Sequence, residues 1–576
     1  MSVKPVLILG AGINGAAVAR ELAINGIPVC MVDTGDVAGG ATSRSSRLIH
    51  GGLRYLEYRD TALVRESLLE RERLLKVAPH FVKPLRLTIP VERRFGGLWA
   101  GFVRFSGLAQ TPLGQTLLKF GRGPRGLLAI KTGLSMYDCL ARSDSLPTHR
   151  IESVTDDASA SEASTSHNKP QVTQRFCWLC SYSDAQIEFP ERFVLAMLED
   201  ARRAADASST LLEILPYHRA VASKSSTNIS IVPTNDDRPT GNTAPPKTIT
   251  PSIIINATGA WGDRTLEALG VWERQLFAGT KGSHLFTTHQ SLIDALNENG
   301  IYAEASDGRL IFILPCAGGV LIGTTDERFE DDPRDAVATP NDVDYLLQMV
   351  SDIFPNIGLT ADDVCMRHAG VRPLPKFDGT AAAIPRGHSL EESRFGSIPI
   401  LTLVGGKLTT CRSLAEDVTR RICQLSQHTQ TNETTSRLLP GADTACSHFL
   451  TEQQLAEAAR DYRLTTEQVA AVWPLIGNRF DEVFTDADNT SIEGTNLPRQ
   501  FVRWSIEHEW CSKLEDLVER RLMLIFHPTI HLSTLRQLAE ELARAGKLSE
   551  SQIDSEVDNV CSRLLKFHGR KVANDL

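Results

Sequence analysis

The sequence predicts an α/β protein that also contains an antiparallel sheet and an all-helical C-terminal part. At 576 residues the chain exceeds what one hydrophobic core can hold, so we expect two or three domains. Short apolar strands at 6–9 and 252–256 each lead through glycine into a helical pattern, which is typical of a parallel sheet covered by helices. Beyond the polar run 427–436, apolar residues recur at helical spacing.

The composition describes a folded, mildly acidic protein. It is 42% hydrophobic and 23% charged, and the net charge of -9 does not favour general nucleic-acid binding. Eleven cysteines show no regular spacing, and the close pair Cys177 and Cys180 lacks a second ligand pair, so we expect reduced thiols and no metal site. A strand pattern begins at Val6 and no run of 18 apolar residues occurs. We therefore expect no signal peptide, no membrane-spanning helix and a cytoplasmic location.

The first strand, helix and second strand have the pattern of a Rossmann-like unit. Gly10, Gly12 and Gly15 follow the first strand in G-x-G-x-x-G spacing. The first glycine permits a tight turn, the second lets a pyrophosphate approach the backbone, and the third lets the helix pack on the sheet. Asp33 ends the second strand, where an acid can bind the hydroxyl pair of a ribose. We therefore predict a dinucleotide site here.

The next segment, GGATSRSSRLIHGGLRYLE at 39–57, resembles the flavin-adjacent loop of the FAD-dependent glycerol-3-phosphate dehydrogenases. That family carries a G-A-T-S-x-x-S-x-L-I-H-G-G-x-R-Y-L run after the acid, and the match is nearly residue for residue. The resemblance reaches from Val6 to about Leu524. It implies a Rossmann-like FAD-binding domain, an antiparallel-sheet substrate domain of the glycine/D-amino-acid oxidase type and an all-helical C-terminal domain. We expect these domains at 1–90, 181–280 and 365–427; at 91–180 and 281–364; and at 437–576.

The resemblance also assigns site residues to this loop. Groups that bind the diphosphate and the flavin would come from Thr42, Ser43, Ser45, Ser46 and His50, while Gly51 and Gly52 would let backbone lie against the isoalloxazine ring. Arg54 and Tyr55 would then face a small anionic substrate. A second nucleotide signature follows the strand at 252–256, with Ala257, Thr258 and Gly259 approaching the cofactor. An NAD enzyme with a single Rossmann unit would not need that second signature.

Three later segments supply the remaining candidates. His284 in TKGSHLF is the candidate base for the substrate hydroxyl proton, the alternative being a histidine hydrogen-bonded inside a strand. Arg372 lies in a run that resembles the family's A-G-x-R-P-L segment and would polarise the developing carbonyl. Arg386 matches the family more loosely and would join Arg54 and Arg372 in a cationic pocket for phosphate.

A fourth segment follows a strand and two glycines. Gly406, Lys407 and Leu408 lead into a helix that begins near Thr409, which we also place at the substrate. Free amides at this helix N-terminus would stabilise charge on the flavin, and Lys407 would add to that or reach the phosphate.

A basic and apolar segment at 93–131 carries seven basic residues and no acid. This character suits contact with an anionic membrane surface, and a helical hairpin packed on the domain is the alternative. The family resemblance implies attachment to the inner face of the membrane, where quinone accepts the electrons, and it leaves room for a homodimer.

The function implied by the resemblance is oxidation of sn-glycerol 3-phosphate to dihydroxyacetone phosphate, with hydride passed to flavin N5 and electrons on to quinone. A dehydrogenase of another polyol phosphate is one alternative. An amine or amino-acid oxidase of the same flavoprotein fold would bind a carboxylate and need a single basic residue. A non-enzymatic FAD-binding sensor would need no cationic pocket of phosphate size.

Overall fold

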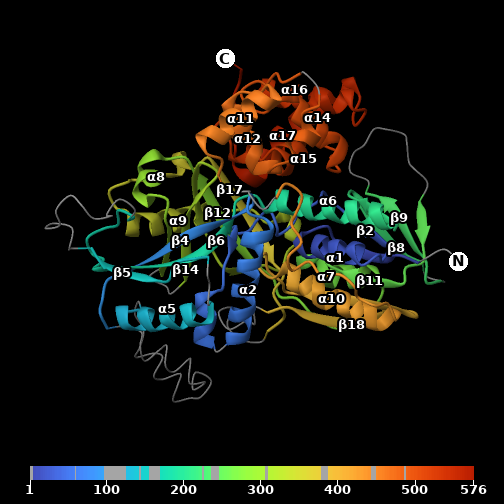
Figure 1. The fold of residues 1–576 in the computed structure, drawn as a ribbon, viewed down its shortest axis with the longest axis horizontal. Coiled ribbons are helices and arrows are strands. Elements are labelled where there is room, and N and C mark those ends of the chain that lie inside the picture. The colour runs from blue at the N-terminus through green and yellow to red at the C-terminus, as the bar shows by residue number, and fades with distance from the viewer. Residues whose placement is uncertain are drawn as a thin grey trace.

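The fold is described from a computed structural model of the chain. It describes residues 4–58, 60–95, 125–141, 145–154, 169–223, 226–234, 246–304, 309–377, 387–442, 449–485 and 488–575. Figure 1 shows two sheets side by side and a group of C-terminal helices that covers one side of the molecule. The predicted combination of a parallel sheet, a largely antiparallel sheet and a helical C-terminal part is confirmed.

A six-stranded sheet contains the predicted Rossmann-like unit, in the order β18-β19-β11-β1-β2-β7. All neighbouring pairs are parallel except β18 with β19. The strands are β1 (Val6–Leu9), β2 (Val29–Val32), β7 (Leu212–Leu215), β11 (Ile253–Asn256), β18 (Ser389–Phe395) and β19 (Ile398–Val404).

Alternate side chains of each strand point to opposite sides of this sheet, and both faces are covered by other elements. In β1, Val6 and Ile8 join a core with α1 (Ile13–Ile24), α6 (Pro190–Ser208) and α10 (Cys411–Ser426). Leu7 and Leu9 join a second core with α7 (Gly262–Ala268) and the small sheet β10-β9-β8. That small sheet consists of β8 (His218–Ala222), β9 (Ile229–Pro233) and β10 (Lys247–Ile249).

The large sheet runs in the order β16-β12-β15-β14-β13-β4-β6-β3, with β17 beside β12 and β5 beside β6. It is antiparallel except for the pair β13 and β4, which is parallel. Its strands are β3 (Leu48–Ile49), β4 (Val82–Val91), β5 (Arg150–Ser153), β6 (Trp178–Ile187), β12 (Thr280–Thr287), β13 (Gly300–Glu304), β14 (Leu310–Cys316), β15 (Gly319–Gly323), β16 (Glu327–Arg328) and β17 (Met366–Arg372).

Four strands of this sheet lie wholly or mostly in ranges that the sequence assigns to the dinucleotide-binding domain. β3 and most of β4 fall within 1–90, most of β6 falls within 181–280, and β17 falls within 365–427, yet all four pair inside the large sheet. The strand pattern alone does not show which sheet a strand joins, and the domain ranges stay a prediction. Helices α2 (Thr61–Val77), α5 (Leu127–Ala141), α8 (Gln290–Leu296) and α9 (Pro340–Ile353) accompany this sheet.

The C-terminal part is helical from Glu452 onward. Its helices are α11 (Glu452–Tyr462), α12 (Thr466–Ile476), α13 (Phe480–Val483), α14 (Arg499–His508), α15 (Leu514–Asp516), α16 (Leu532–Arg544) and α17 (Ile553–His568), with a π-helical turn at Leu517–Arg521 and a short 3-10 turn at Leu524–Phe526. Apolar residues recur at helical spacing through 499–526, but the structure divides this run into several elements. Trp510 and Met523 adopt left-handed backbone at φ 52° and 54°, and neither is a glycine that would have revealed the break.

The predicted membrane-contact segment 93–131 lies mostly outside the described residues, at 96–124. Its described ends are an exposed Phe95 and the start of α5. Over the part of the chain that the structure describes, no helix is both long and apolar enough to cross a membrane.

Candidate active site

The turn between β1 and α1 has no room for side chains at two of its glycines. Gly10 has φ +104°, and a Cβ there would lie 2.6 Å from the Ala257 carbonyl oxygen. A Cβ on Gly15 would lie 2.0 Å from the Gly10 carbonyl oxygen. Backbone therefore packs on backbone here, as the G-x-G-x-x-G spacing predicts.

Asp33 lies directly beside this turn. Its carboxylate accepts hydrogen bonds from the Ala11 amide at 2.7 Å and the Gly35 amide at 2.8 Å. Burial raises the pKa of this carboxyl above its usual range. A carboxylate has about four acceptor positions, so the two amides leave room for the predicted ribose hydroxyls.

The loop at 39–55 contacts three other segments of the chain. Thr42 Oγ1 accepts a hydrogen bond from the Ile13 amide at 3.0 Å, at the start of α1. Ser46 Oγ and His284 Nε2 share a hydrogen bond of 2.9 Å. The His50 amide donates to Thr409 Oγ1 at 3.2 Å. One short stretch thus brings together the dinucleotide turn, the candidate base and the start of α10.

Buried polar side chains hold this loop in place. Arg47 forms a fully buried ion pair with Glu191 of α6 at 2.7 Å. The Gly51 amide donates to Tyr137 Oη at 2.9 Å, and Tyr137 donates in turn to Asp184 at 2.7 Å. No sequence motif assigns a role to Arg47 or Tyr137. These partners meet the loop only through tertiary packing, so they were not predictable from the sequence.

The segment after β19 lies against the same loop. The Lys407 amine lies 4.0 Å from the centre of the Tyr55 ring, within the range of a cation-π contact. Gly406 has φ +92°, and a Cβ there would lie 2.4 Å from Asn14 Nδ2. The buried Asn14 Oδ1 has no hydrogen-bond partner among the described residues. Asn14 is one of the variable positions of the glycine motif, so no pattern pointed to it.

His284 is buried within β12 and stacks on His368 of β17, with ring centres 4.9 Å apart. Burial, followed by the charges of Arg372 and Arg47, lowers the pKa of His284 to about 3. The imidazole is therefore neutral, which leaves a ring nitrogen able to accept a proton. His368 is a further residue at the site that the sequence did not indicate.

The predicted cations differ in what they bind. Arg372, on β17, forms an ion pair with Asp326 at 3.0 Å and donates to Thr324 Oγ1 at 2.9 Å. The buried Nε of Arg54 has no hydrogen-bond partner among the described residues. Arg386 lies outside the described residues.

Several predicted cofactor residues use their hydroxyls to hold local turns. Ser43 donates to the Gly40 carbonyl at 3.1 Å, and Ser45 donates to the Thr42 carbonyl at 3.2 Å. Thr258 donates to Asn256 Oδ1 at 2.7 Å. We still predict that the backbone amides of Ser43, Ser45 and Thr258 bind the cofactor. We predict the same for the backbone amides near Gly12, Gly259 and Leu408.

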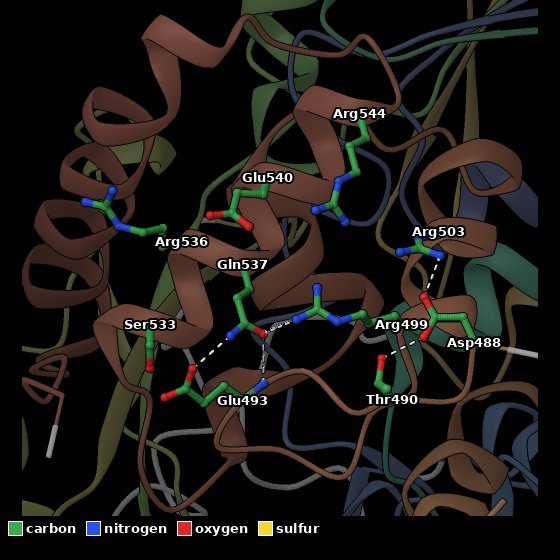
Figure 2. Close-up of a pocket in the computed structure, with 10 residues that line it drawn as sticks. All are labelled: Asp488, Thr490, Glu493, Arg499, Arg503, Ser533, Arg536, Gln537, Glu540 and Arg544. Atoms are coloured by element: carbon green, nitrogen blue, oxygen red, sulfur yellow. Dashed lines mark hydrogen bonds and ion pairs between the residues drawn. The ribbon is translucent and has the colours of Figure 1, made fainter.

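A pocket of about 430 Å³ lies elsewhere, among the C-terminal helices (Figure 2). Four arginines line it, together with acidic and amide side chains: Arg499, Arg503, Arg536, Arg544, Asp488, Glu493, Gln537 and Glu540. None of the residues predicted for catalysis is among its lining residues. Within the described ranges, no three His, Cys, Asp or Glu side chains are grouped as a metal site.

The chain resembles known proteins over nearly all of its length. It is 32% identical to a glycerol-3-phosphate dehydrogenase of Synechocystis sp., over 76% of this chain and 73% of that protein. It is 30% identical to the D-erythritol 1-phosphate dehydrogenase of Brucella abortus, over 91% and 95%. It is 28% identical to the aerobic glycerol-3-phosphate dehydrogenase of Escherichia coli, over 90% and 94%.

The fold agrees with a solved structure and with a family model. The crystal structure of the glycerol-3-phosphate dehydrogenase from Bacillus halodurans complexed with FAD matches with a TM-score of 0.68 at 21% identity, over 98% of this chain and 95% of that chain. The model of the FAD dependent oxidoreductase family matches residues 5–421. The chain therefore belongs to the FAD dependent oxidoreductases, and FAD is its cofactor.

Proposed function

We propose that this flavoenzyme oxidises sn-glycerol 3-phosphate to dihydroxyacetone phosphate and passes the electrons to a membrane quinone. The observation that carries the proposal is the reach of the loop at 39–55. It contacts the start of α1 through Thr42, the candidate base through Ser46 and the Lys407 amine through Tyr55. The names of the three relatives above, two of them glycerol-3-phosphate dehydrogenases, support a polyol phosphate as substrate.

The residues present fit FAD. Gly10 and Gly15 leave space only for backbone, which holds the turn closely against the start of α1, and Gly12 has no side chain to keep phosphate groups from the amides there. The buried Asn14 Oδ1, without a partner among the described residues, is an acceptor that a bound N–H group would satisfy. We expect Asp33 at the ribose, and the amides near Ser45 and Gly406 at the diphosphate and flavin. When bound, FAD supplies the acceptor for the substrate hydride.

The chain's own residues would bind and orient the substrate. Arg54 has a buried Nε that lacks a partner among the described residues, and a phosphate oxygen would satisfy it. Lys407 adds a second positive charge above the Tyr55 ring. Asp326 and Thr324 fix the guanidinium of Arg372, which would stabilise the negative charge that develops on the substrate oxygen as its proton leaves, and would then polarise the carbonyl that forms.

His284 would accept the hydroxyl proton. Its ring is neutral because burial lowers its pKa to about 3, and Ser46 fixes its orientation through Nε2. In the tautomer whose Nε2 hydrogen is donated to Ser46 Oγ, the buried Nδ1, which has no partner among the described residues, is the nitrogen that would take the proton. A pKa this low makes the free enzyme's histidine a weak base. We therefore expect the negative charges of the bound substrate to raise the pKa of His284.

A second polyol phosphate is a specific alternative. The Brucella relative named for D-erythritol 1-phosphate aligns with 95% of its length and is more identical to this chain than the Escherichia coli enzyme is. Comparing kcat/KM for glycerol 3-phosphate and erythritol 1-phosphate, with a soluble quinone analogue as acceptor, tests the choice. We expect the higher value for glycerol 3-phosphate, and a tenfold preference for the longer substrate would overturn the assignment.

Attachment to the inner face of the membrane is part of the same proposal. The exposed Phe95 stands at the described edge of the basic segment 93–131. Deleting 96–126 and fractionating the cells tests this, because unchanged sedimentation with membranes would remove the idea. Light scattering of the purified protein tests the homodimer that we include in the proposal.

A further inference from the structure

We propose that Arg520 and Arg521, in the C-terminal helices, are positioning residues for the adenosine end of FAD. They would act through Asp36, which lies in the loop at 33–38 immediately after the predicted ribose-binding acid. The inference rests on the assignment of Gly10 to Asp33 to the adenosine end. It does not depend on the identity of the substrate.

The loop at 33–38 is bonded to the dinucleotide turn at both of its ends. Asp33 accepts from the Ala11 amide at 2.7 Å, and the Ala38 amide donates to the Ala11 carbonyl at 3.0 Å. Ala11 is the single residue between the first two glycines of the motif. Any displacement of this loop therefore moves the backbone that would hold the pyrophosphate and the ribose.

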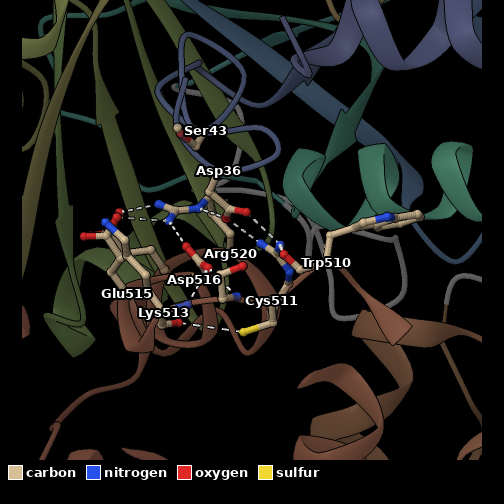
Figure 3. Close-up of polar contacts among 12 residues, drawn as sticks. Asp36, Ser43, Trp510, Cys511, Lys513, Glu515, Asp516 and Arg520 are labelled. Atoms are coloured by element: carbon tan, nitrogen blue, oxygen red, sulfur yellow. Dashed lines mark hydrogen bonds and ion pairs between the residues drawn. The ribbon is translucent and has the colours of Figure 1, made fainter. Parts of the chain in front are cut away.

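The outer side of the same loop is bonded to the C-terminal helices. The Asp36 carboxylate accepts from Arg520 Nε at 2.5 Å (Figure 3). It also accepts from Arg521 Nη1 at 2.5 Å and from Arg521 Nη2 at 2.8 Å. All three side chains are at most 3% exposed. Burial alone would raise the pKa of Asp36, but the two guanidinium groups more than offset it and lower the pKa.

A second connection joins the same two regions through Tyr217. Its amide donates to the Gly35 carbonyl at 2.9 Å, inside the loop. Its hydroxyl donates to Asp516 Oδ1 in the C-terminal helices, and Arg520 donates to the same oxygen at 3.0 Å. The loop is thus bonded to the C-terminal helices at Asp36 and, through Tyr217, at Gly35.

These bonds make the position of the loop depend on residues nearly 500 positions away in the sequence. A buried ion pair that loses one partner leaves an uncompensated charge, which the structure relieves by moving. The loop after β2 is the short irregular element at this contact, whereas the arginines lie in a helical turn at the centre of a packed core. We infer that the loop, and with it the cofactor end, would move.

The test compares two variants that each remove one buried charge from a contact between the C-terminal helices and the rest of the chain. Asp36→Asn weakens the contact at the loop. Glu509→Gln weakens the contact of Glu509 with Arg192 of α6, which has 2.6 Å bonds and is equally buried, but does not involve the loop. Each holoenzyme variant is diluted at a temperature below its unfolding midpoint. Release of FAD is then followed by the rise in flavin fluorescence.

We expect Asp36→Asn to accelerate FAD release at least tenfold and Glu509→Gln less than threefold. With excess FAD, Asp36→Asn should regain wild-type KM for the substrate, since only the adenosine end is displaced. Equal release rates in the two variants, or no acceleration in Asp36→Asn, would overturn the inference. If Asp36→Asn does not fold, Arg521→Lys and Arg521→Met serve instead, and release must be faster in the methionine variant.

Discussion

Two regions of this molecule gather arginines, and they use them differently. In the pocket of the C-terminal helices, Arg499, Arg503 and Arg544 all bind the fully buried carboxylate of Glu541, at 2.9, 2.8 and 2.6 Å. At the candidate active site, the buried Arg54 Nε has no partner among the described residues, and the Lys407 amine lies on an aromatic face.

The volume of a pocket and the number of cations that line it therefore do not by themselves identify a binding site for an anion. The pocket is rich in arginine, but each of its four guanidinium groups is already paired with a carboxylate. An unsatisfied buried donor costs about 1–3 kcal/mol, and an anion bound at Arg54 Nε would remove that cost. The predictions below test this contrast.

The largest effect is expected for Arg372→Ala. Removal of a cation that stabilises charge developing during the reaction should lower kcat by about 10²- to 10³-fold. FAD should stay bound, because the contacts of Arg372 are to Thr280, Thr324 and Asp326 and not to the dinucleotide turn. Steady-state turnover and the flavin absorbance per protein measure the two quantities. Full activity would contradict the role of Arg372.

A second large effect is expected for Gly15→Ala. Its new Cβ would lie 2.0 Å from the Gly10 carbonyl oxygen, so the dinucleotide turn must shift. We expect at least a tenfold weaker binding of FAD, measured by equilibrium dialysis. Gly133→Ala in α5 is the control, since a Cβ there meets its nearest atom only at 3.9 Å. Equal FAD binding by both variants would show that the turn does not hold the cofactor.

A medium effect is expected from acid. Unfolded histidine titrates near pH 6.5, while burial lowers the pKa of His284 and of His80 to about 3. Between these values the unfolded chain binds a proton that the folded chain does not. The contribution of these histidines to stability is therefore fully present above about pH 6.5. As the pH decreases below that value, the free energy of unfolding falls by about 1.4 kcal/mol per pH unit for each histidine.

Replacing either histidine by asparagine should make this loss shallower, as measured by urea unfolding at several pH values. His80 is buried against Gly477, so His80→Asn should keep its activity. His284→Asn should lose most of its turnover. If His80→Asn and His284→Asn both lost activity, the loss would not distinguish the two histidines. That result would argue against a special role of His284.

The smallest effect is expected for Arg499→Ala in the arginine-rich pocket. Arg503 and Arg544 still compensate Glu541, so kcat/KM should stay within twofold of wild type. Arg54→Ala, the matched variant at the candidate site, should raise KM for the phosphate substrate about tenfold or more. Similar KM values for the two variants would remove the distinction between the regions.

Much of the fold was predictable because its pattern is local. The apolar strand, the glycine spacing and Asp33 specify the first βαβ unit within 30 residues, and the structure confirms it. The strand pairing of β6 and β17 was not, because alternation of apolar residues does not identify the partner strand. The breaks at Trp510 and Met523 were also hidden, since neither position carries a glycine or proline.

The site was predictable where a motif lists its residues, and not where side chains meet by tertiary packing. The run at 39–55 named Ser46 and Tyr55 in advance, but not that they contact His284 and Lys407. Asn14 and His368 belong to no pattern in a single sequence. The bonds of Asp36 to Arg520 and Arg521 join positions that only the folded chain brings together.

The most direct test of the proposed function is anaerobic addition of substrate to the purified yellow protein. Glycerol 3-phosphate should bleach the visible flavin absorbance, whereas glycerol without phosphate should not, because Arg54 and Lys407 would have no anion to bind. Bleaching by amino acids, with none by glycerol 3-phosphate or erythritol 1-phosphate, would contradict the account.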